Sequence, residues 1–165
     1  MKRLIVIGGA MRIGKTTVCR ELQNRLPNCV FLDGDWCWDA KPFIVNESTK
    51  KMVLDNIAHL LNNFLMCEAY ENVLFCWVLH RQEILDALLA RLHTEGARVY
   101  AISLICDADT LRGRVQSDIN SGICGSTAME RSLAYRPMYD SMHTKKICVG
   151  ENPNQTADAI LNIVR

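Results

Sequence analysis

The fold of this chain is decided by one stretch, Gly9-Ala10-Met11-Arg12-Ile13-Gly14-Lys15-Thr16. It fits the pattern G-x-x-x-x-G-K-[ST], in which glycines let backbone N–H groups turn toward an anion. The apolar run Leu4–Ile7 before it predicts a buried strand, and apolar residues at helical spacing from Val18 to Leu26 predict a helix with one inward face. Strand, glycine turn and helix together distinguish a working phosphate-binding loop from a chance match. We therefore expect a triphosphate to bind here.

Two side chains of this loop have specific expected contacts. Lys15 should reach the β- and γ-phosphates, where the N-terminus of the following helix adds roughly half a positive charge. The hydroxyl of Thr16 should lie on a magnesium ion. The residues expected to hold the nucleotide through this loop are Gly9, Ala10, Met11, Arg12, Ile13, Gly14, Lys15, Thr16 and Thr17.

Composition indicates one globular domain spanning residues 1–165, with 49% hydrophobic and 22% charged residues. The net charge of +1 favours neither a nucleic-acid nor a membrane partner, and no apolar run approaches the roughly 20 residues of a membrane span. The eight cysteines lack C-x-x-C spacing, which favours free thiols in a reducing compartment. We therefore expect a cytoplasmic protein, either a monomer or a homodimer, that acts on a small molecule.

Strand and helix patterns alternate along the whole chain, which predicts a parallel sheet covered by helices on both faces. Further strands are expected at residues 29–32, 72–78, 99–106 and 146–149. Helices are expected at about 47–69, before Gly96, after a cap at Asp107, at 127–142, and from Pro153 after a cap at Asn152. Thr127 with Glu130 fits a capping box.

The magnesium site needs an acid, and the ends of the third and fourth predicted strands do not supply one at the usual Walker B position. Motifs of GTPases and transport ATPases are also missing. Asp33-Gly34-Asp35 follows the second predicted strand, where ligands bind in open α/β sheets. We expect one of these carboxylates to serve the metal and the other a substrate hydroxyl. The alternative is that they only cap a turn or a helix.

With GGAMRIGKTT after the first strand, DGD after the second, and an arginine-bearing helix before a glycine loop, the chain resembles the small P-loop kinases. It is most similar in layout to shikimate, gluconate and chloramphenicol phosphotransferases, with adenylate kinase more distant. The resemblance implies a three-layer α/β P-loop NTPase fold, a five-stranded parallel sheet of order 2-3-1-4-5 and a short lid at about 118–128. It also implies ATP as donor, Mg²⁺, and a small-molecule acceptor.

The resemblance also implies roles for particular residues. Asp33 matches the acid that holds magnesium or accepts a proton, and Asp35 matches the acid that grips the acceptor. Arg112 and Arg114 match arginines that cover the adenine and phosphates, unless they form the solvated face of a helix. The expected catalytic residues are Lys15, Asp33 and Arg114, and the expected metal ligands are Thr16 and Asp33. Arg131 matches a lid or substrate-side arginine that would bind the acceptor, unless it forms a surface salt bridge, and Arg136 is the fallback for that role. Asn152 lies where the family wraps the adenine, mostly through backbone contacts.

The chain departs from the family at the phosphate loop and around the acceptor. Arg12 places a long cation where small residues are usual; we expect it to point to solvent, the alternative being that it stabilises transferring charge. The lid lacks the arginine-rich signature of shikimate kinase, which argues against shikimate. The aromatic residues near the presumed acceptor site are Trp36, Trp38 and Phe43, and they suggest a flat acceptor unless they pack as a separate cluster. His80 and Arg81 are expected on the opposite wall.

These observations leave three functional hypotheses open. The leading one is an ATP-dependent kinase that phosphorylates a hydroxyl of a small molecule. The second is a nucleoside or nucleotide kinase, which the aromatic residues favour and the missing basic cluster opposes. The third is a nucleotide-binding regulatory module that has lost transfer activity. Whether Asp33 and Asp35 converge on the space in front of Lys15 separates the first two hypotheses from the third.

Overall fold

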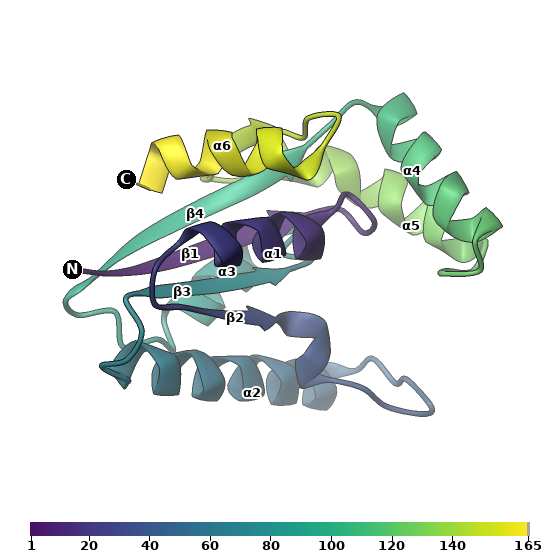
Figure 1. The fold of residues 1–165 in the computed structure, drawn as a ribbon. Coiled ribbons are helices and arrows are strands. Elements are labelled where there is room, and N and C mark those ends of the chain that lie inside the picture. Colours follow the sequence, from purple (N-terminus) through teal and green to yellow (C-terminus); the bar gives the residue numbers. More distant parts are fainter. Residues whose placement is uncertain (165) are drawn as a thin grey trace.

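The computed structural model describes residues 1–164, and their centre is a five-stranded sheet of order β2-β3-β1-β4-β5 in which every neighbouring pair is parallel (Figure 1). The strands are β1 (Lys2–Gly9), β2 (Cys29–Asp33), β3 (Asn72–Trp77), β4 (Ala97–Ile105) and β5 (Lys145–Cys148). The predicted fold class and strand order are therefore confirmed. Strand β1 is central and is buried from Leu4 onward, which explains its unbroken apolar run.

Helices cover both faces of this sheet (Figure 1). They are α1 (Lys15–Arg25), the 3-10 turn η1 (Gly34–Cys37), α2 (Glu47–Met66), α3 (Gln82–Leu89), α4 (Ala108–Asn120), α5 (Thr127–Tyr135), the 3-10 turn η2 (Arg136–Tyr139) and α6 (Pro153–Val164). Helices α1 and α6 lie together on one face, while α4 and α5 project beyond the carboxyl ends of the strands. In residues 1–164 no helix is long and apolar enough to cross a membrane.

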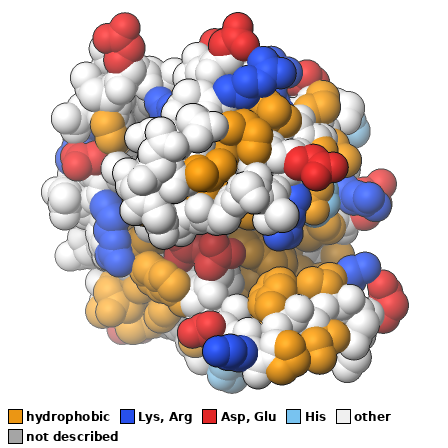
Figure 2. Space-filling view, turned by 90° about the vertical axis from the view of Figure 1, so that its right-hand side faces the viewer, with side chains coloured by type: hydrophobic (Ala, Val, Ile, Leu, Met, Phe, Trp, Pro, Cys, Tyr) orange, Lys and Arg blue, Asp and Glu red, His pale blue; other side chains and the backbone are white. Residues whose placement is uncertain are grey.

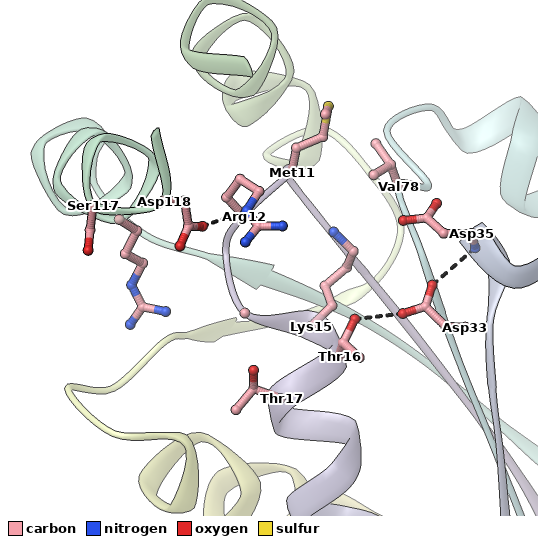
Figure 3. Close-up of a pocket in the computed structure, with 12 residues that line it drawn as sticks. Met11, Arg12, Lys15, Thr16, Thr17, Asp33, Asp35, Val78, Ser117 and Asp118 are labelled. Carbon is pink, nitrogen blue, oxygen red and sulfur yellow. Dashed lines mark hydrogen bonds and ion pairs between the residues drawn. The ribbon is translucent and has the colours of Figure 1, made fainter. Parts of the chain in front are cut away.

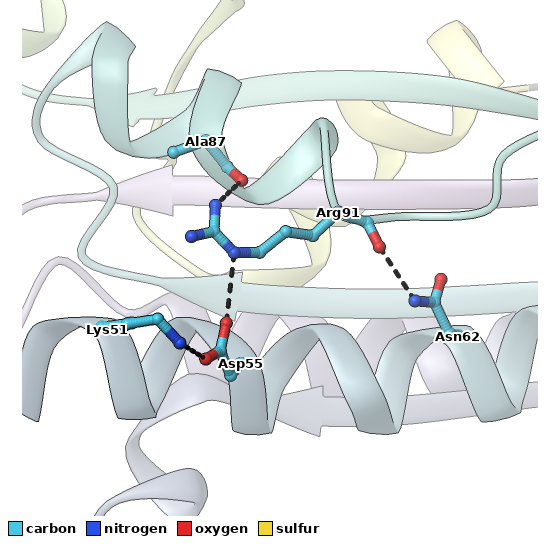
Figure 4. Close-up of polar contacts among 5 residues, drawn as sticks. All are labelled: Lys51, Asp55, Asn62, Ala87 and Arg91. Atoms are coloured by element: carbon cyan, nitrogen blue, oxygen red, sulfur yellow. Dashed lines mark hydrogen bonds and ion pairs between the residues drawn. The ribbon is translucent and has the colours of Figure 1, made fainter.

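A polar network ties α2 to the end of α3 (Figure 4). The Arg91 guanidinium donates from Nη1 to the Ala87 carbonyl at 2.5 Å and from Nε to Asp55 Oδ1 at 3.3 Å. Asp55 also pairs with Lys51, and Asn62 Nδ2 donates to the Arg91 carbonyl at 2.9 Å. These contacts satisfy carbonyls at the C-terminal end of α3 and fix α2 beside it.

Two predicted helix caps are confirmed. Asp107 Oδ1 accepts from the Thr110 N–H at 2.7 Å, and Asn152 Oδ1 accepts from the Gln155 N–H at 3.1 Å. The long helix α2 begins with a reciprocal cap between Asn46 and Thr49 that the sequence analysis did not identify. Both kinds of cap satisfy N–H groups that have no partner inside the helix.

Two predicted C-terminal helix ends and one predicted capping box are wrong. Helix α2 ends at Met66 and not near residue 69, because Cys67 turns to an extended conformation. Helix α5 ends at Tyr135 and not near residue 142, since Pro137 follows and η2 begins at Arg136. Thr127 does not form a capping box with Glu130: the backbone is already helical at Ser126, so Thr127 lies inside the first turn.

Candidate active site

The phosphate-binding loop ends at Gly14, which has φ +104° and precedes the first residue of α1. Residue 12 also has a left-handed backbone, with φ +64°. No side chain caps the N-terminus of α1, and its first turn holds no acidic residue. The free N–H groups and the positive end of the helix dipole are therefore available to an anion.

The loop borders a cavity of about 460 Å³ that is open to solvent (Figure 3). The cavity lies between the loop, the carboxyl ends of β2 and β3, and α4. It is lined by Met11, Arg12, Gly14, Lys15, Thr16, Thr17, Asp33, Asp35, Val78, Arg114, Ser117 and Asp118. The structure therefore brings six of the nine expected loop residues, both carboxylates and Arg114 to one space, while Gly9, Ala10 and Ile13 do not line it.

Lys15 is partly buried and does not extend freely into solvent. Its Nζ donates to the Gly9 and Ala10 carbonyls, each at 2.9 Å. Burial lowers the pKa of its ammonium group, and the nearby carboxylates of Asp35 and Asp33 oppose that shift. The lysine is thus held inside the loop at the edge of the cavity, where phosphate oxygens can replace the two carbonyls.

Asp33 connects the phosphate loop to the second strand. Its Oδ2 accepts from the Thr16 hydroxyl at 2.6 Å, and its Oδ1 accepts from the Asp35 N–H at 3.0 Å. The carboxylate therefore does cap η1, the role weighed as an alternative, while its other oxygen still faces the expected metal ligand Thr16. A hydroxyl and a carboxylate in contact are hard oxygen donors of the kind that Mg²⁺ takes together with phosphate oxygens. Within residues 1–164 no group of three or more His, Cys, Asp or Glu side chains is arranged to hold a metal.

Asp35 lies at the mouth of the cavity, and the pKa of its carboxyl group is raised. Burial of its carboxyl raises the pKa, and the neighbouring Asp33 raises it further. The nearby Lys15 ammonium and, to a smaller extent, the Trp77 side chain oppose these effects on the pKa. A Cβ atom at Gly34 would lie 2.5 Å from the Trp77 ring, so glycine is required for η1 to pack here. Trp77, the last residue of β3, is only partly buried and contacts this site.

Of the two expected α4 arginines, the structure brings Arg114 to the cavity. Its Nη1 donates to the Ile13 carbonyl at 2.8 Å, and its Nη2 donates to the Gly150 carbonyl at 3.0 Å. It therefore joins the phosphate loop to the loop after β5. Arg112 is exposed and pairs with Asp109 on the solvated side of α4, away from the cavity lining. A nucleotide contact by Arg112 stays a prediction.

Arg12 does not point freely to solvent, so that expectation is wrong. Its Nε donates to Asp118 Oδ2 on α4 at 2.5 Å. One residue earlier, the Met11 carbonyl accepts from the Ser132 hydroxyl of α5 at 3.1 Å. The sequence analysis missed Asp118 and Ser132, because nothing in a local pattern indicates a partner more than a hundred residues away.

The aromatic residues expected near the acceptor divide into two groups, and neither group lines the cavity. Trp36 is 53% exposed and packs edge-on against Phe31, with the Arg20 guanidinium 5.2 Å from its ring centre, and it does not line the cavity. Trp38 packs on Phe43 at 4.3 Å between ring centres. Figure 2 looks onto this end of the molecule and shows a hollow above a lower lobe on which hydrophobic side chains gather.

The remaining predicted acceptor and lid residues lie outside the cavity lining. His80 stacks on Tyr135 of α5 with ring centres 4.2 Å apart, and burial lowers the pKa of its imidazole. Arg81 precedes α3 and Arg131 lies on α5, both exposed. The fallback Arg136 donates from Nε to the Cys106 carbonyl at 2.6 Å. Contacts of these residues with an acceptor stay predictions.

The predicted lid and adenine-binding segments are short. The lid at 118–128 consists of the end of α4, the loop 121–126 and the first residues of α5. Asn152 is exposed after β5, and its side chain is engaged in capping α6. A contact with adenine by this segment would therefore use its backbone.

The fold and the cavity define a P-loop protein. A family model described as an AAA domain matches residues 5–131, and the chain belongs to this family. A search of curated proteins found no match. Structural similarity covers nearly the whole chain, as expected from the sequence.

Three solved structures illustrate that similarity. A sugar kinase from Janibacter sp. HTCC2649 has a TM-score of 0.74 at 14% identity, covering 99% of this chain and 95% of that one. A tunicamycin resistance protein from Deinococcus radiodurans has a TM-score of 0.70 at 19% identity, covering 99% and 96%. A gluconokinase from Sinorhizobium meliloti 1021 has a TM-score of 0.68 at 17% identity, covering 98% and 93%. At these identities the likeness describes the fold.

Proposed function

We propose that this protein transfers the γ-phosphoryl group of ATP to a hydroxyl of a small molecule. The observation that carries the proposal is the convergence of Lys15, the Thr16–Asp33 pair and Asp35 on one cavity in front of a free helix N-terminus. A module that only binds nucleotide has no need of a second carboxylate at the open end of that cavity. Two of the similar structures are a gluconokinase and a sugar kinase, which supports the same reaction class.

Each residue has a distinct part in the proposed reaction. Magnesium, held by Thr16, Asp33 and phosphate oxygens, would neutralise charge on the triphosphate. Lys15 exchanges its two carbonyl partners for phosphate oxygens, and Arg114 adds a second cation beside Gly14. Asp35 accepts a hydrogen bond from the acceptor hydroxyl and orients it toward the γ-phosphorus.

The transfer step forms one bond and breaks another. The acceptor oxygen bonds to the γ-phosphorus while the bond from phosphorus to the β–γ bridging oxygen breaks, and ADP leaves with that electron pair. The proton of the acceptor hydroxyl passes to the Asp33–Asp35 carboxylate pair. Closure of the 118–128 segment would exclude water that otherwise competes as acceptor.

A nucleoside or nucleotide acceptor is the second candidate, and one observation favours it. Trp38 and Phe43 pack together at the end of η1 and in the segment that follows it, and flat ring systems stack well on such pairs. A monophosphate is the weaker case, because the acceptor end of the lining holds Asp33, Asp35 and Val78 and no cation.

The test is a panel of sugars, sugar acids, nucleosides and ring-bearing antibiotics, incubated with ATP and Mg²⁺ and scored for phosphorylated product. Lys15→Ala should abolish transfer and strongly weaken ATP binding, because the phosphate oxygens lose their cation. Asp33→Asn should lower turnover by roughly 10²-fold or more. Unchanged ATP affinity of Lys15→Ala in calorimetry, or unchanged turnover of Asp33→Asn, would contradict the assignment.

A further inference from the structure

Three consecutive residues of the phosphate loop are held by α4 and α5, the two helices whose ends form part of the predicted lid. Met11 and Ile13 are held through their carbonyls, by Ser132 of α5 and Arg114 of α4. Arg12 between them is held through its side chain, by Asp118 of α4. The two carbonyl contacts do not depend on which side chains occupy positions 11 and 13. The ion pair does depend on Arg12 and Asp118, so it is the specific feature of this chain.

The backbone at Arg12 makes the presence of a long side chain there unusual. Its φ of +64° lies in the left-handed region, where a non-glycine residue is disfavoured. Glycine would adopt this conformation with less strain. A role for the guanidinium would explain why a strained position carries an arginine.

The hydrogen-bonding pattern of the guanidinium leaves one edge free. Only Nε is bonded to Asp118, and within residues 1–164 neither Nη1 nor Nη2 has a hydrogen-bond partner. The side chain of Arg12 is 34% exposed and lines the same cavity as Lys15. Figure 3 shows the side chain directed toward Asp118, with its guanidinium in the space that Lys15 also borders.

We infer that Arg12 contacts the terminal phosphate of the bound nucleotide and that Asp118 is the positioning residue that orients it. Asp118 fixes the guanidinium through Nε, and the two terminal amino groups then bind phosphate oxygens in a two-pronged contact. Because Arg12 is part of the loop, this cation is supplied by the loop and not by the lid. The inference deepens the proposed function and rests on it for the identity of the ligand.

The test compares binding of ADP with binding of a non-hydrolysable β,γ-imido analogue of ATP, both with Mg²⁺, by calorimetry. Arg12→Gly is the informative variant, because glycine suits the left-handed backbone and so offsets part of the stability lost with the ion pair. It should weaken analogue binding about tenfold to a hundredfold, the scale of a lost charged hydrogen bond, and change ADP binding less than about twofold. Arg25→Ala, which breaks an Arg–Asp pair between α1 and α6 away from the cavity, is the matched control and should change neither.

Asp118 is tested through its effect on Arg12. Asp118→Asn should weaken analogue binding by a smaller factor, Asp118→Glu should partly restore it, and the double variant with Arg12→Gly should bind no more weakly than Arg12→Gly alone. Additive losses, or tighter analogue binding by Asp118→Asn, would show that Asp118 does not orient Arg12. Equal losses for ADP and the analogue in Arg12→Gly would overturn the phosphate contact.

The outcomes separate this inference from the proposed function. If the wild-type chain phosphorylates an acceptor while Arg12→Gly keeps both turnover and preference for the analogue, the inference fails and the function stands. If no acceptor is phosphorylated but the predicted loss of analogue binding is found, the inference stands and the transfer proposal fails. Wild-type protein that binds neither nucleotide overturns both.

Discussion

At the scale of single residues, Asp33 shows how one carboxylate serves both fold and site. One oxygen caps η1 through the Asp35 N–H, and the other holds the Thr16 hydroxyl. From the sequence, capping and metal binding were alternative roles for Asp33. The cap uses Oδ1 and the proposed metal contact would use Oδ2, so one carboxylate can serve both roles. This arrangement fixes Thr16 before any metal or nucleotide arrives.

Asp35 gives a prediction about pH. Its pKa is raised in the folded state by burial and by Asp33, so folding favours the neutral form. The stabilising contribution is present at low pH and is lost as pH rises through the raised pKa. Asp35→Asn should therefore raise the melting temperature at pH 7, with the gain disappearing as pH falls below the raised pKa. Thermal unfolding of both proteins from pH 4 to pH 8 measures this, and an equal gain at every pH would contradict it.

Asp35→Asn should also separate stability from function. If the ionised carboxylate grips the acceptor, the variant should be more stable at neutral pH and have a higher acceptor KM, with a smaller change in kcat. A matching Asp33→Asn variant should instead lose turnover, because its carboxylate holds Thr16. Indistinguishable kinetics of the two variants would argue against separate roles.

At the scale of elements, the geometry of the site depends on the polar contacts by which α4 and α5 hold the phosphate loop. Ser132 is fully buried, and its hydroxyl donates to the Met11 carbonyl. Ser132→Ala leaves that carbonyl without this donor, which should lower the free energy of unfolding by about 1–3 kcal/mol. It should also weaken nucleotide binding, because the loop loses one of its supports.

Urea unfolding and calorimetry measure the two effects of Ser132→Ala. Ser141→Ala is a matched control, because that hydroxyl also donates to a carbonyl, of Met138, but on the exposed surface after η2. The control should change stability by less than about 0.5 kcal/mol and leave nucleotide affinity unaltered. A loss in Ser141→Ala as large as that in Ser132→Ala would contradict the role of the α5 contact.

At the scale of the whole molecule, a cavity lined by charged side chains lies at the carboxyl ends of the strands, and an exposed apolar segment follows η1. The segment after η1 exposes Phe43, Ile44 and Val45, each more than half exposed. A flat acceptor that covered these side chains would gain stacking and apolar burial. These side chains are therefore the proposed contact surface for a flat acceptor.

Tryptophan fluorescence tests this location. A nucleoside or ring-bearing acceptor should change the emission, and Trp38→Phe should remove more of the change than Trp36→Phe, because Trp36 is engaged with Phe31 and Arg20. Phenylalanine keeps an aromatic ring at each position, so the fold should persist. Trp77 will contribute background, since it is only partly buried. If no ring-bearing compound alters emission, a sugar or sugar acid becomes the better candidate.

The sequence by itself determined the phosphate loop, the parallel sheet and the two caps at Asp107 and Asn152. These features follow from short-range chemistry: a glycine turn, a run of apolar residues, or a side chain three positions from an N–H. Its errors were also local, at helix ends such as that of α5, where Pro137 ends the helix. Strand order came from resemblance to the kinase group.

Only the tertiary structure decided how the site is assembled. The contacts from Arg114 to Ile13, Arg12 to Asp118 and Ser132 to Met11 join residues 101, 106 and 121 positions apart. No spacing rule indicates such partners, because they depend on how the sheet directs β4 and carries α4 and α5 over its carboxyl end. The sequence could therefore identify the loop that binds phosphate, while the packing of distant helices decided where its arginine is held.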